Sequence, residues 1–376
     1  MKKIGITGQN GFVGQHLYNT IGLTPEIYQR IEFKKDFFED SDALDKFVSQ
    51  CDVIVHLAAM NRHESQEFIY KNNIELVQRL TASLERTKSK AHVLFSSSSQ
   101  EERDNLYGKS KKEGRQLLAT WATSVGGIFT GMLIPNVFGP FCFPNYNSFI
   151  ATFCYKLTHN ETPTIDIDGE VQLIYVGELV NEILNQINLG KTNESYTVNP
   201  TARYKVSEVL SMLQDYKERY FDNGEIPMLN SIFEVNLFNT YRSYIDYSSH
   251  YPIKFIQHTD SRGSFVEVTR LGVGGQVSFS TTVPEITRGN HFHTRKIERF
   301  AVIKGKALIQ LRKIGTDEVL NFYLDGKQPA YVDMPIWYTH NIKNIGEELL
   351  YTNFWINEFY NPKDPDTYFE SVTSDL

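Results

Sequence analysis

The segment Ile4–Gly14 constrains the fold of this chain more than any other stretch. It reads I-G-I-T-G-Q-N-G-F-V-G, a short apolar run interrupted and followed by glycines. This order predicts a strand that turns through Gly8, Gly11 and Gly14 into a helix carrying Phe12. Glycine lets the backbone approach a pyrophosphate closely, and the helix N-terminus supplies N–H donors to it. A plain glycine-rich turn is the alternative, but the position between a strand and a helix favours a dinucleotide site.

The pattern of apolar residues divides the chain of 376 residues into two regions. Up to about Leu189, short apolar runs alternate with longer amphipathic stretches, which predicts βαβ units and a parallel sheet. From about Ile253 onward, short β-rich runs are separated by Gly, Asp, Asn and Pro, which predicts an all-β sandwich or barrel. We therefore expect an α/β Rossmann-type, doubly wound parallel sheet over residues 1–245 and an all-β barrel over residues 253–376. The segment Tyr241–Pro252 is the expected linker.

Composition and charge argue against several classes of protein. Lys and Arg number 38 against 45 Asp and Glu, which leaves a net charge of -7 where a nucleic-acid-binding protein usually has a basic excess. The apolar stretches end well short of the ~20 residues that a membrane span needs, and no signal-peptide pattern is present. Cys51, Cys142 and Cys154 are odd in number and form no CxxC pair. We expect a cytoplasmic protein with neither a nucleic acid nor a membrane as partner.

A tyrosine and a lysine with helical spacing follow a run of serines. Tyr107 and Lys111 are four residues apart, so a helix would present both on one face. The ammonium group of Lys111 would then stabilise the phenolate of Tyr107 and lower its pKa. A tyrosine tuned in this way exchanges a proton when a hydride moves to or from a carbon that bears oxygen. The serine run, Ser96–Ser99, ends the preceding apolar strand.

These motifs together resemble one family. In addition to the glycine segment, the serines and the Tyr107–Lys111 pair, the chain has HLAA at His56–Ala59 and PNVFGP at Pro135–Pro140. In this order they resemble the extended short-chain dehydrogenases/reductases of the nucleotide-sugar branch. Each motif alone is weak, whereas the ordered set is specific.

The resemblance implies roles for individual residues. Tyr107 would be the acid/base, Lys111 would hold the nicotinamide ribose and Tyr107, and Ser98 would bind the substrate oxygen, with Ser97 as the alternative. The chain departs from the family in the short segment between Ser98 and Tyr107, and in Leu133, where many relatives carry arginine. The residues expected around the dinucleotide are Gly8, Gly11, Phe12, Gly14, Leu57, Ala58, Tyr107 and Lys111.

The end of the second expected strand bears on the choice of cofactor. An acidic residue there would hold a ribose 2′-hydroxyl, whereas basic side chains would accept a 2′-phosphate. The stretch is mixed: Arg30, Lys34 and Lys35 favour NADPH, and Glu32 or Asp36 would suit NADH. A solvated loop of mixed charge is the third interpretation. We expect NADPH, held by Arg30 and Lys34.

A second cluster of reactive side chains lies in the all-β region. His291 and His293 are two residues apart, so a strand would point both to one face, and Glu298 follows close behind. His340, after Pro335, can complete the set. Three imidazoles and one carboxylate suit a divalent transition metal, with Zn, Fe, Mn and Ni all admissible and zinc expected.

This second region resembles the cupins and, among them, the 4-keto-6-deoxysugar 3,5-epimerases. The likeness to the epimerases rests on the segments Asp260–Phe265, Gln276–Ser280 and Thr287–His291. In those relatives the histidine at the position of His291 is a base, commonly without a metal. The resemblance therefore implies a catalytic role for His291 that competes with its role as a metal ligand.

Over its whole length the chain resembles the bifunctional capsule enzymes of bacteria, which join such a reductase to an epimerase-like cupin. Pro144–Lys156 and Asp364–Glu370 add to this likeness. It implies a UDP-2-acetamido-2,6-dideoxy-4-ketohexose as substrate, which is a UDP-4-keto-6-deoxy-HexNAc. The cupin would epimerise this sugar at carbon 3, and the reductase would then reduce it at carbon 4 with NADPH. The product would be UDP-2-acetamido-2,6-dideoxy-L-talose, on the way to UDP-N-acetyl-L-fucosamine. It also implies a homodimer.

Two other functions remain open from the sequence. A non-catalytic sensor of NADP or a metabolite would share both folds, but intact Tyr107 and Lys111 argue against it. A simple 4,6-dehydratase would need an acid/base couple, typically Asp-Glu, beside the serine. Here Ser98 is followed by Ser99, Gln100 and then two glutamates, which weakens that alternative.

Overall fold

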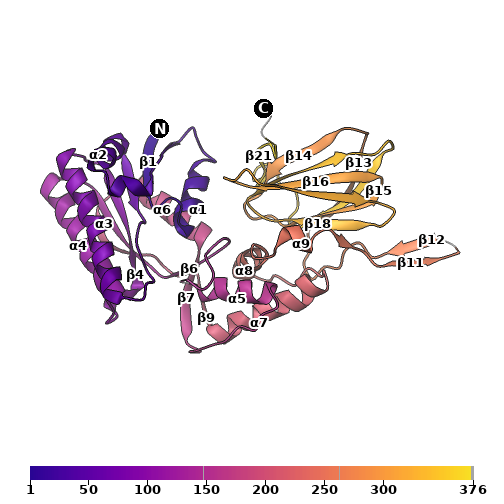
Figure 1. Cartoon of the computed structure of the whole chain (residues 1–376), viewed down its shortest axis with the longest axis horizontal. Coiled ribbons are helices and arrows are strands. Elements are labelled where there is room, and N and C mark those ends of the chain that lie inside the picture. Colours follow the sequence, from indigo (N-terminus) through magenta and orange to yellow (C-terminus); the bar gives the residue numbers. More distant parts are fainter. Residues whose placement is uncertain (147, 262, 374–376) are drawn as a thin grey trace. The chain divides into compact units, whose positions relative to one another are not determined.

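The computed structural model describes residues 1–146, 148–261 and 263–373 (Figure 1). Contacts divide the chain into two compact units, residues 1–152 with 167–206 and residues 153–166 with 207–376. The functional domains expected at 1–245 and 253–376 stay a prediction. Asn147 and Arg262, which belong to the segments Pro144–Lys156 and Asp260–Phe265 named above, lie outside the described residues.

The first unit is built on a parallel six-stranded sheet, as the alternating pattern predicts. Its parallel pairing is continuous from edge to edge. The spatial order of the strands is β2 (Tyr28–Ile31), β1 (Lys2–Thr7), β3 (Val53–His56), β4 (His92–Ser98), β5 (Phe129–Ile134) and β8 (Asn193–Thr197).

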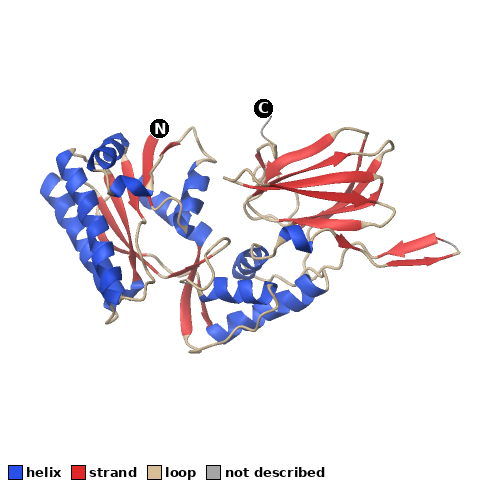
Figure 2. Ribbon diagram, viewed as in Figure 1, coloured by secondary structure: helices blue, strands red, loops and turns tan. Residues whose placement is uncertain are grey.

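Helices cover both faces of this sheet (Figure 2). Alternate residues of one strand point to opposite faces: Ile54 packs in one core cluster, and Val53 and Val55 pack in the other. The first cluster is closed by helices α2 (Ser41–Gln50), α3 (Gln66–Arg86) and α4 (Leu106–Val125), and the second by α1 (Phe12–Ile21) and α6 (Val176–Leu189). The predicted doubly wound α/β sheet is therefore confirmed.

The strand order determines where a ligand can bind. The chain leaves β1 toward β2 and then crosses back to place β3 on the other side of β1. At such a switch point the loops diverge, and a crevice opens beyond the carboxyl ends of the two strands. A small neighbouring sheet extends the unit; its strands are β6 (Asn136–Phe138), β7 (Glu170–Tyr175) and β9 (Ala202–Lys205).

The second unit contains antiparallel sheets, which confirms the all-β prediction for the C-terminal region. One five-stranded sheet has the order β10 (Ile253–Lys254), β18 (Ala330–Met334), β15 (Glu298–Lys304), β20 (Leu350–Ile356) and β13 (Gln276–Thr282). The other has the order β17 (Val319–Asp325), β16 (Lys306–Lys313), β19 (Tyr338–Asn344), β14 (Thr287–Phe292) and β21 (Tyr368–Phe369). A separate hairpin is formed by β11 (Gln257–Asp260) and β12 (Gly263–Val266).

Helical segments precede these sheets in the chain. They are α5 (Phe149–Thr158), inside which one division between the units falls, then α7 (Val206–Tyr216), a π-helical turn (Lys217–Asp222), α8 (Ile232–Arg242) and α9 (Tyr247–His250). The segment expected as a linker, Tyr241–Pro252, lies within them. It includes the end of α8 and all of α9, and Tyr241, Tyr247 and Tyr251 are buried. The segment expected as a linker is therefore partly helical and packed within the second unit, and the domain boundary placed there stays a prediction.

A buried polar network explains why that segment packs against the barrel. The hydroxyl of Tyr220 donates to Asp333 on β18 at 2.7 Å and lies 2.9 Å from the hydroxyl of Tyr251. Arg299 on β15 binds both carboxylate oxygens of Asp333, at 2.7 and 2.9 Å. Arg242 donates to the hydroxyl of Tyr220 at 3.1 Å. These mutual hydrogen bonds allow Arg242 and Tyr251 of the segment to be buried against the strands.

In the part of the chain that the structure describes, no helix combines the length and the apolar character needed to cross a bilayer.

Candidate functional site

The glycine segment forms a tight turn at the carboxyl end of β1. Gly8 has φ +77°, and a Cβ there would lie 2.9 Å from the backbone nitrogen of Ala58. A Cβ on Gly14 would lie 2.2 Å from the carbonyl oxygen of Gly8. Glycine is required at both positions, because a side chain would collide with backbone. The turn brings the N-terminus of α1, which begins at Phe12, to the mouth of the crevice between β1 and β3.

A pocket of about 740 Å³ opens at this point of the first unit. Its lining joins the glycine turn to the serine run and to the Tyr107–Lys111 helix. Of the residues that the sequence predicts around the dinucleotide or the substrate, the lining includes Gly8, Gly11, Phe12, Gly14, Leu57, Ser97, Ser98, Tyr107 and Lys111, and Ala58 lies directly behind Gly8. Its size lies in the range of small-molecule sites.

The serines at the end of β4 make different hydrogen bonds, and these show which of them has a hydroxyl proton available for a substrate. Ser96 donates to the backbone carbonyl of His56 at 3.2 Å. Ser97 donates to the carboxylate of Glu101, which in turn binds Arg115 at 2.7 and 2.8 Å. The hydroxyl oxygen of Ser98 accepts the N–H of Gln100 at 3.1 Å, so its own proton can be donated to a substrate. This geometry favours Ser98 over Ser97 as the residue that contacts the substrate.

Helix α4 positions Tyr107 and Lys111. The side chain of Asn105 caps the helix by accepting the N–H of Gly108 at 2.7 Å, which starts α4 just before Tyr107. The Lys111 ammonium donates to the carbonyl of Ser96 at 2.7 Å and lies 5.9 Å from the centre of the Tyr107 ring.

The electrostatics of this pair differ from the prediction. Burial raises the pKa of Tyr107 to about 12, with a smaller contribution from Tyr146. Burial also lowers the pKa of Lys111 to about 8, against the opposing charge of Glu101. The sequence had predicted a lowered pKa for Tyr107; that was wrong because removing the phenolate from water outweighs the distant ammonium. Tyr107 is therefore protonated at neutral pH, the form that can donate a proton to a ketone.

The basic residues expected near the cofactor lie at the edge of the first unit. Arg30 on β2 has its guanidinium 4.5 Å above the ring of Tyr18, and Lys34 is exposed immediately before a short 3-10 helix. Within the described residues, neither of them lines the pocket. Gln9, which the sequence analysis did not single out, links the glycine turn to this edge, because its side-chain oxygen accepts the N–H of Phe33 at 2.9 Å.

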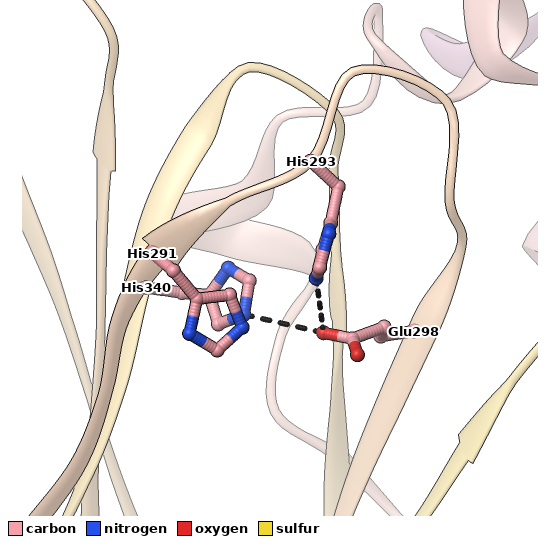
Figure 3. A group of neighbouring side chains, drawn as sticks. All are labelled: His291, His293, Glu298 and His340. Atoms are coloured by element: carbon pink, nitrogen blue, oxygen red, sulfur yellow. Dashed lines mark ion pairs between the residues drawn. The ribbon is translucent and has the colours of Figure 1, made fainter. Parts of the chain in front are cut away.

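The four residues of the expected metal cluster converge in the second unit (Figure 3). His291, the penultimate residue of β14, has its ring beside that of His340 from β19, at a distance of 4.6 Å between ring centres. The carboxylate of Glu298, at the start of β15, lies 3.1 Å from Nε2 of His293 and 3.2 Å from Nε2 of His340. One ligand atom from each of the four residues lies within 4.8 Å of the others.

The donor atoms of this cluster fit a metal ion. Nε2 of His293, Nε2 of His340 and Oε2 of Glu298 are buried, and none of them has a well-aligned hydrogen bond to another described residue. Burial raises the pKa of Glu298, but the close imidazoles of His293 and His340 outweigh it and leave the pKa well below its usual value. Burial lowers the pKa of His291 to about 4. An ionised carboxylate among imidazole nitrogens is a donor set that transition metals prefer.

The segments that resemble the epimerases flank this cluster in the chain. Gln276–Ser280 belongs to β13, at the edge of its sheet, and the described part of Asp260–Phe265 forms the β11–β12 hairpin. The third segment, Thr287–His291, belongs to β14, and Arg288 within it donates to the hydroxyl of Thr282 at 3.1 Å.

Comparison with known proteins identifies both regions. A model of the NAD-dependent epimerase/dehydratase family matches residues 4–199, more than half of the chain. The chain belongs to the NAD-dependent epimerase/dehydratase family. In this member of the family, a second match covers residues 258–368 and is described as a polysaccharide biosynthesis C-terminal domain.

This member of the family has full-length relatives. It is 31% identical over 98% of its length to a Pseudomonas aeruginosa protein named UDP-2-acetamido-2,6-beta-L-arabino-hexul-4-ose reductase, of which it covers 99%. It is also similar to the crystal structure of the capsular polysaccharide assembling protein CapF from Staphylococcus aureus, with 36% identity and a TM-score of 0.62, over 98% of this chain and all of that one. The predicted resemblance to two-part capsule enzymes of the CapF type is therefore confirmed.

A shorter match concerns a Bacillus subtilis protein. The spore coat polysaccharide biosynthesis protein SpsL is 27% identical over 123 residues, which are 30% of this chain and 82% of SpsL.

Proposed function

We propose that the first unit reduces the 4-keto group of a UDP-sugar with NADPH, in the synthesis of a bacterial polysaccharide. The observation that carries this proposal is the pocket that joins the glycine turn to Ser98, Tyr107 and Lys111. Similarity over nearly the whole chain to a protein named as a UDP-hexulose reductase supports the same reaction. The substrate that we infer is a UDP-2-acetamido-2,6-dideoxy-4-ketohexose, and the product is UDP-2-acetamido-2,6-dideoxy-L-talose, on the way to UDP-N-acetyl-L-fucosamine.

Reduction of the ketone requires a hydride at carbon 4 and a proton at its oxygen. A bound NADPH would supply the hydride and would thereby be oxidised to NADP⁺. Tyr107 donates its phenolic proton to the oxygen as the carbonyl π bond breaks, and the Lys111 ammonium stabilises the phenolate that remains. Ser98 donates a hydrogen bond to the same oxygen, which orients the carbonyl toward Tyr107. The raised pKa of Tyr107 keeps this proton in place until the hydride arrives.

We further propose that the second unit contains a cupin that epimerises carbon 3 of the same sugar. A ketone at carbon 4 acidifies the hydrogen on carbon 3, so one base and one acid on opposite faces of the ring are sufficient. His291 is the base in this proposal. His293, Glu298 and His340 would hold a divalent metal, for which we propose zinc, with His291 as a fourth ligand if it is not the base. A bound ion would supply positive charge beside the keto oxygen.

The experiment that tests the reductase uses the whole protein, NADPH and a UDP-4-keto-6-deoxy-HexNAc, with mass spectrometry of the sugar. We expect a product heavier by one hydride and one proton, with matching consumption of NADPH. A sugar recovered unchanged, with NADPH bound but not consumed, would favour the non-catalytic sensor instead.

The surroundings of Glu101 weaken the 4,6-dehydratase alternative. A dehydratase would need a free carboxylic acid near the serine to protonate the leaving hydroxyl. Glu101 is 6% exposed and is held by Ser97 and by two of the three guanidinium nitrogens of Arg115. Glu102 is exposed and faces Lys112 at 3.4 Å. Neither glutamate is therefore suited to that role.

We also propose a homodimer in the cytoplasm. Val277 and Phe279 on β13 are 56% and 71% exposed, at the edge of a sheet whose apolar side chains a second copy can cover. Cys51, Cys142 and Cys154 are buried free thiols, as expected for a reducing compartment. Light scattering on the purified protein tests the dimer: a monomer mass at micromolar concentration contradicts it.

A further inference from the structure

The segment Asp364–Glu370, which we call the C-terminal strap, lies against the metal cluster. Its strand β21 pairs with β14, so that Phe369 is opposite His291 and Tyr368 is opposite Phe292. The N–H of Glu370 donates to the carbonyl of Asn290 at 3.0 Å. The strap is therefore joined along its length to the strand that carries the first histidine of the cluster.

Within the strap, Asp366 makes the most contacts to the loop between His293 and Glu298. Its carboxylate accepts the N–H groups of Thr294, Arg295 and Lys296 at 3.0 to 3.1 Å, and the hydroxyl of Thr294 at 2.7 Å. Asp366 is 3% exposed. A carboxylate that binds three successive backbone N–H groups fixes the path of the loop.

The backbone of Asp366 contacts a cluster residue directly. Nδ1 of His293 lies in short hydrogen-bond contact with the carbonyl oxygen of Asp366. A carbonyl can only accept, so Nδ1 carries a proton, and Nε2 is the ring nitrogen that is left to bind a metal ion. Nε2 is the atom that faces Glu298 at 3.1 Å. Asp366 has φ +42°, a left-handed conformation that a residue other than glycine adopts where its contacts impose it.

We propose that Asp366 is a positioning residue of the metal cluster, which fixes the tautomer of His293 and the loop that separates His293 from Glu298. The inference rests on the metal site under Proposed function. The carboxylate of Asp366 holds the loop and its backbone carbonyl holds the ring of His293, so the two ligands that flank the loop, His293 and Glu298, reach the cluster with their geometry set in advance. Partners of this kind typically change metal affinity 10- to 100-fold when they are replaced.

The test measures the affinity of the full-length protein for Co²⁺ and Zn²⁺ by competition with a chelator, together with the visible absorption of bound Co²⁺. Asp366→Asn keeps the size of the side chain but loses the charge and one acceptor oxygen. We expect its affinity to fall roughly 10- to 100-fold and the Co²⁺ bands to shift. The matched control is Asp364→Asn, which changes an exposed carboxylate of the same strap that pairs with Arg295 at 2.9 Å. Its affinity and spectrum should stay as in the wild type.

The outcomes separate this inference from the metal site itself. Wild-type protein that binds neither ion overturns the site and the role of Asp366 with it. Wild-type protein that binds while Asp366→Asn binds equally well, with the same spectrum, overturns the role alone. An equal loss in both variants, or a loss matched by a lower melting temperature of the metal-free protein, also overturns it, since Asp366 would then act through general stability.

A milder variant decides the question if Asp366→Asn does not fold. Thr294→Val removes one hydroxyl contact to Asp366 and leaves the side chain of nearly the same shape. We expect a fall of a few-fold in affinity with an unchanged melting temperature of the metal-free protein. Unchanged affinity in this variant would contradict the inference.

Discussion

Tyr107 and Lys111 respond in opposite directions to the same loss of water. Burial disfavours whichever form is charged, so it raises the pKa of Tyr107 to about 12 and lowers that of Lys111 to about 8. At neutral pH both groups carry a proton. The pair is therefore prepared for reduction, in which Tyr107 gives its proton to the substrate and Lys111 keeps its charge.

Replacing Tyr107 by Phe tests the proton transfer. The variant keeps the ring and loses the donor, so NADPH oxidation with a 4-keto sugar should fall by about 10²- to 10⁴-fold, as is typical when a general acid is removed. Binding of NADPH, measured by fluorescence titration, should be close to that of the wild type. Turnover at the wild-type rate would remove Tyr107 from the mechanism.

The pH profile tests the charge of Lys111. Since the pKa of Lys111 is about 8 and that of Tyr107 about 12, the ammonium is the first of the two groups to lose its proton as the pH rises. We expect kcat/KM for NADPH, which reports the free enzyme, to decline above about pH 8. Lys111→Arg, which stays charged, should be slower but lack this decline. A wild-type profile that is flat to pH 10 would show that the charge is dispensable.

At the scale of elements, the sequence predicts best what depends on neighbours along the chain. The turn through Gly8 and Gly14 and the helix that carries both Tyr107 and Lys111 are local, and spacing predicted them. Which serine donates to Glu101 depends on Arg115, fourteen residues further along, and the spacing alone did not separate Ser97 from Ser98. Burial is also invisible to spacing, which is why the direction of the pKa shift of Tyr107 was wrong.

The edge strand β2 and the residues after it carry the prediction on cofactor choice. Lys34 is exposed and directly follows Phe33, whose N–H donates to the side chain of Gln9 in the glycine turn. A 2′-phosphate of a bound cofactor would lie near this position. Lys34→Gln should lower the affinity of the protein for NADPH about 10- to 100-fold and leave its affinity for NADH nearly unchanged. This is the effect expected for the loss of one charge-assisted hydrogen bond of about 1.5–3 kcal/mol. Lys46→Gln on helix α2 is the control, an exposed lysine with the same substitution. Tighter binding of NADH than NADPH by the wild type would contradict the choice of cofactor.

Strands β14, β15 and β19 supply the proposed metal ligands together with the loop after β14, and removal of one ligand tests them. Elemental analysis should find close to one transition ion per chain in the wild type. His340→Ala removes a fully buried ligand, so both the metal content and the melting temperature should fall, because metal binding is linked to folding. A variant that retains the full metal content would exclude His340 from the site.

At the scale of the whole molecule, the sequence analysis lacked the long-range contacts. Asp366 is 73 residues from His293, and the pattern around it showed only a likeness to other chains. The segment Tyr241–Pro252 was expected to be a linker. In the structure its Tyr251, together with Tyr220, donates a hydrogen bond to Asp333, which lies on a strand about 80 residues or more further along the chain. Contacts of this kind join residues far apart in sequence, and neither periodicity nor motif spacing reveals them.

The two reactive clusters lie in different units of the chain, which predicts that their reactions are separable. The pocket with Tyr107 is lined by residues of the first unit, and the cluster with His291 belongs to the second. Epimerisation removes the proton on carbon 3 and returns one from a protein group that exchanges with solvent. In D₂O, the protein should therefore incorporate deuterium at carbon 3 of the 4-keto sugar without any NADPH. Mass spectrometry of the recovered sugar measures this incorporation.

Two variants complete that experiment. Tyr107→Phe should still incorporate deuterium at close to the wild-type rate, because the reductase pocket takes no part in the exchange. His291→Ala should lose the exchange while its first unit still binds NADPH, which serves as the control for folding. The opposite pattern, with exchange abolished by Tyr107→Phe and intact in His291→Ala, would mean that the reductase pocket itself enolises the sugar. The barrel would then be an accessory to the first unit, and His291 would be left with the role of a metal ligand alone.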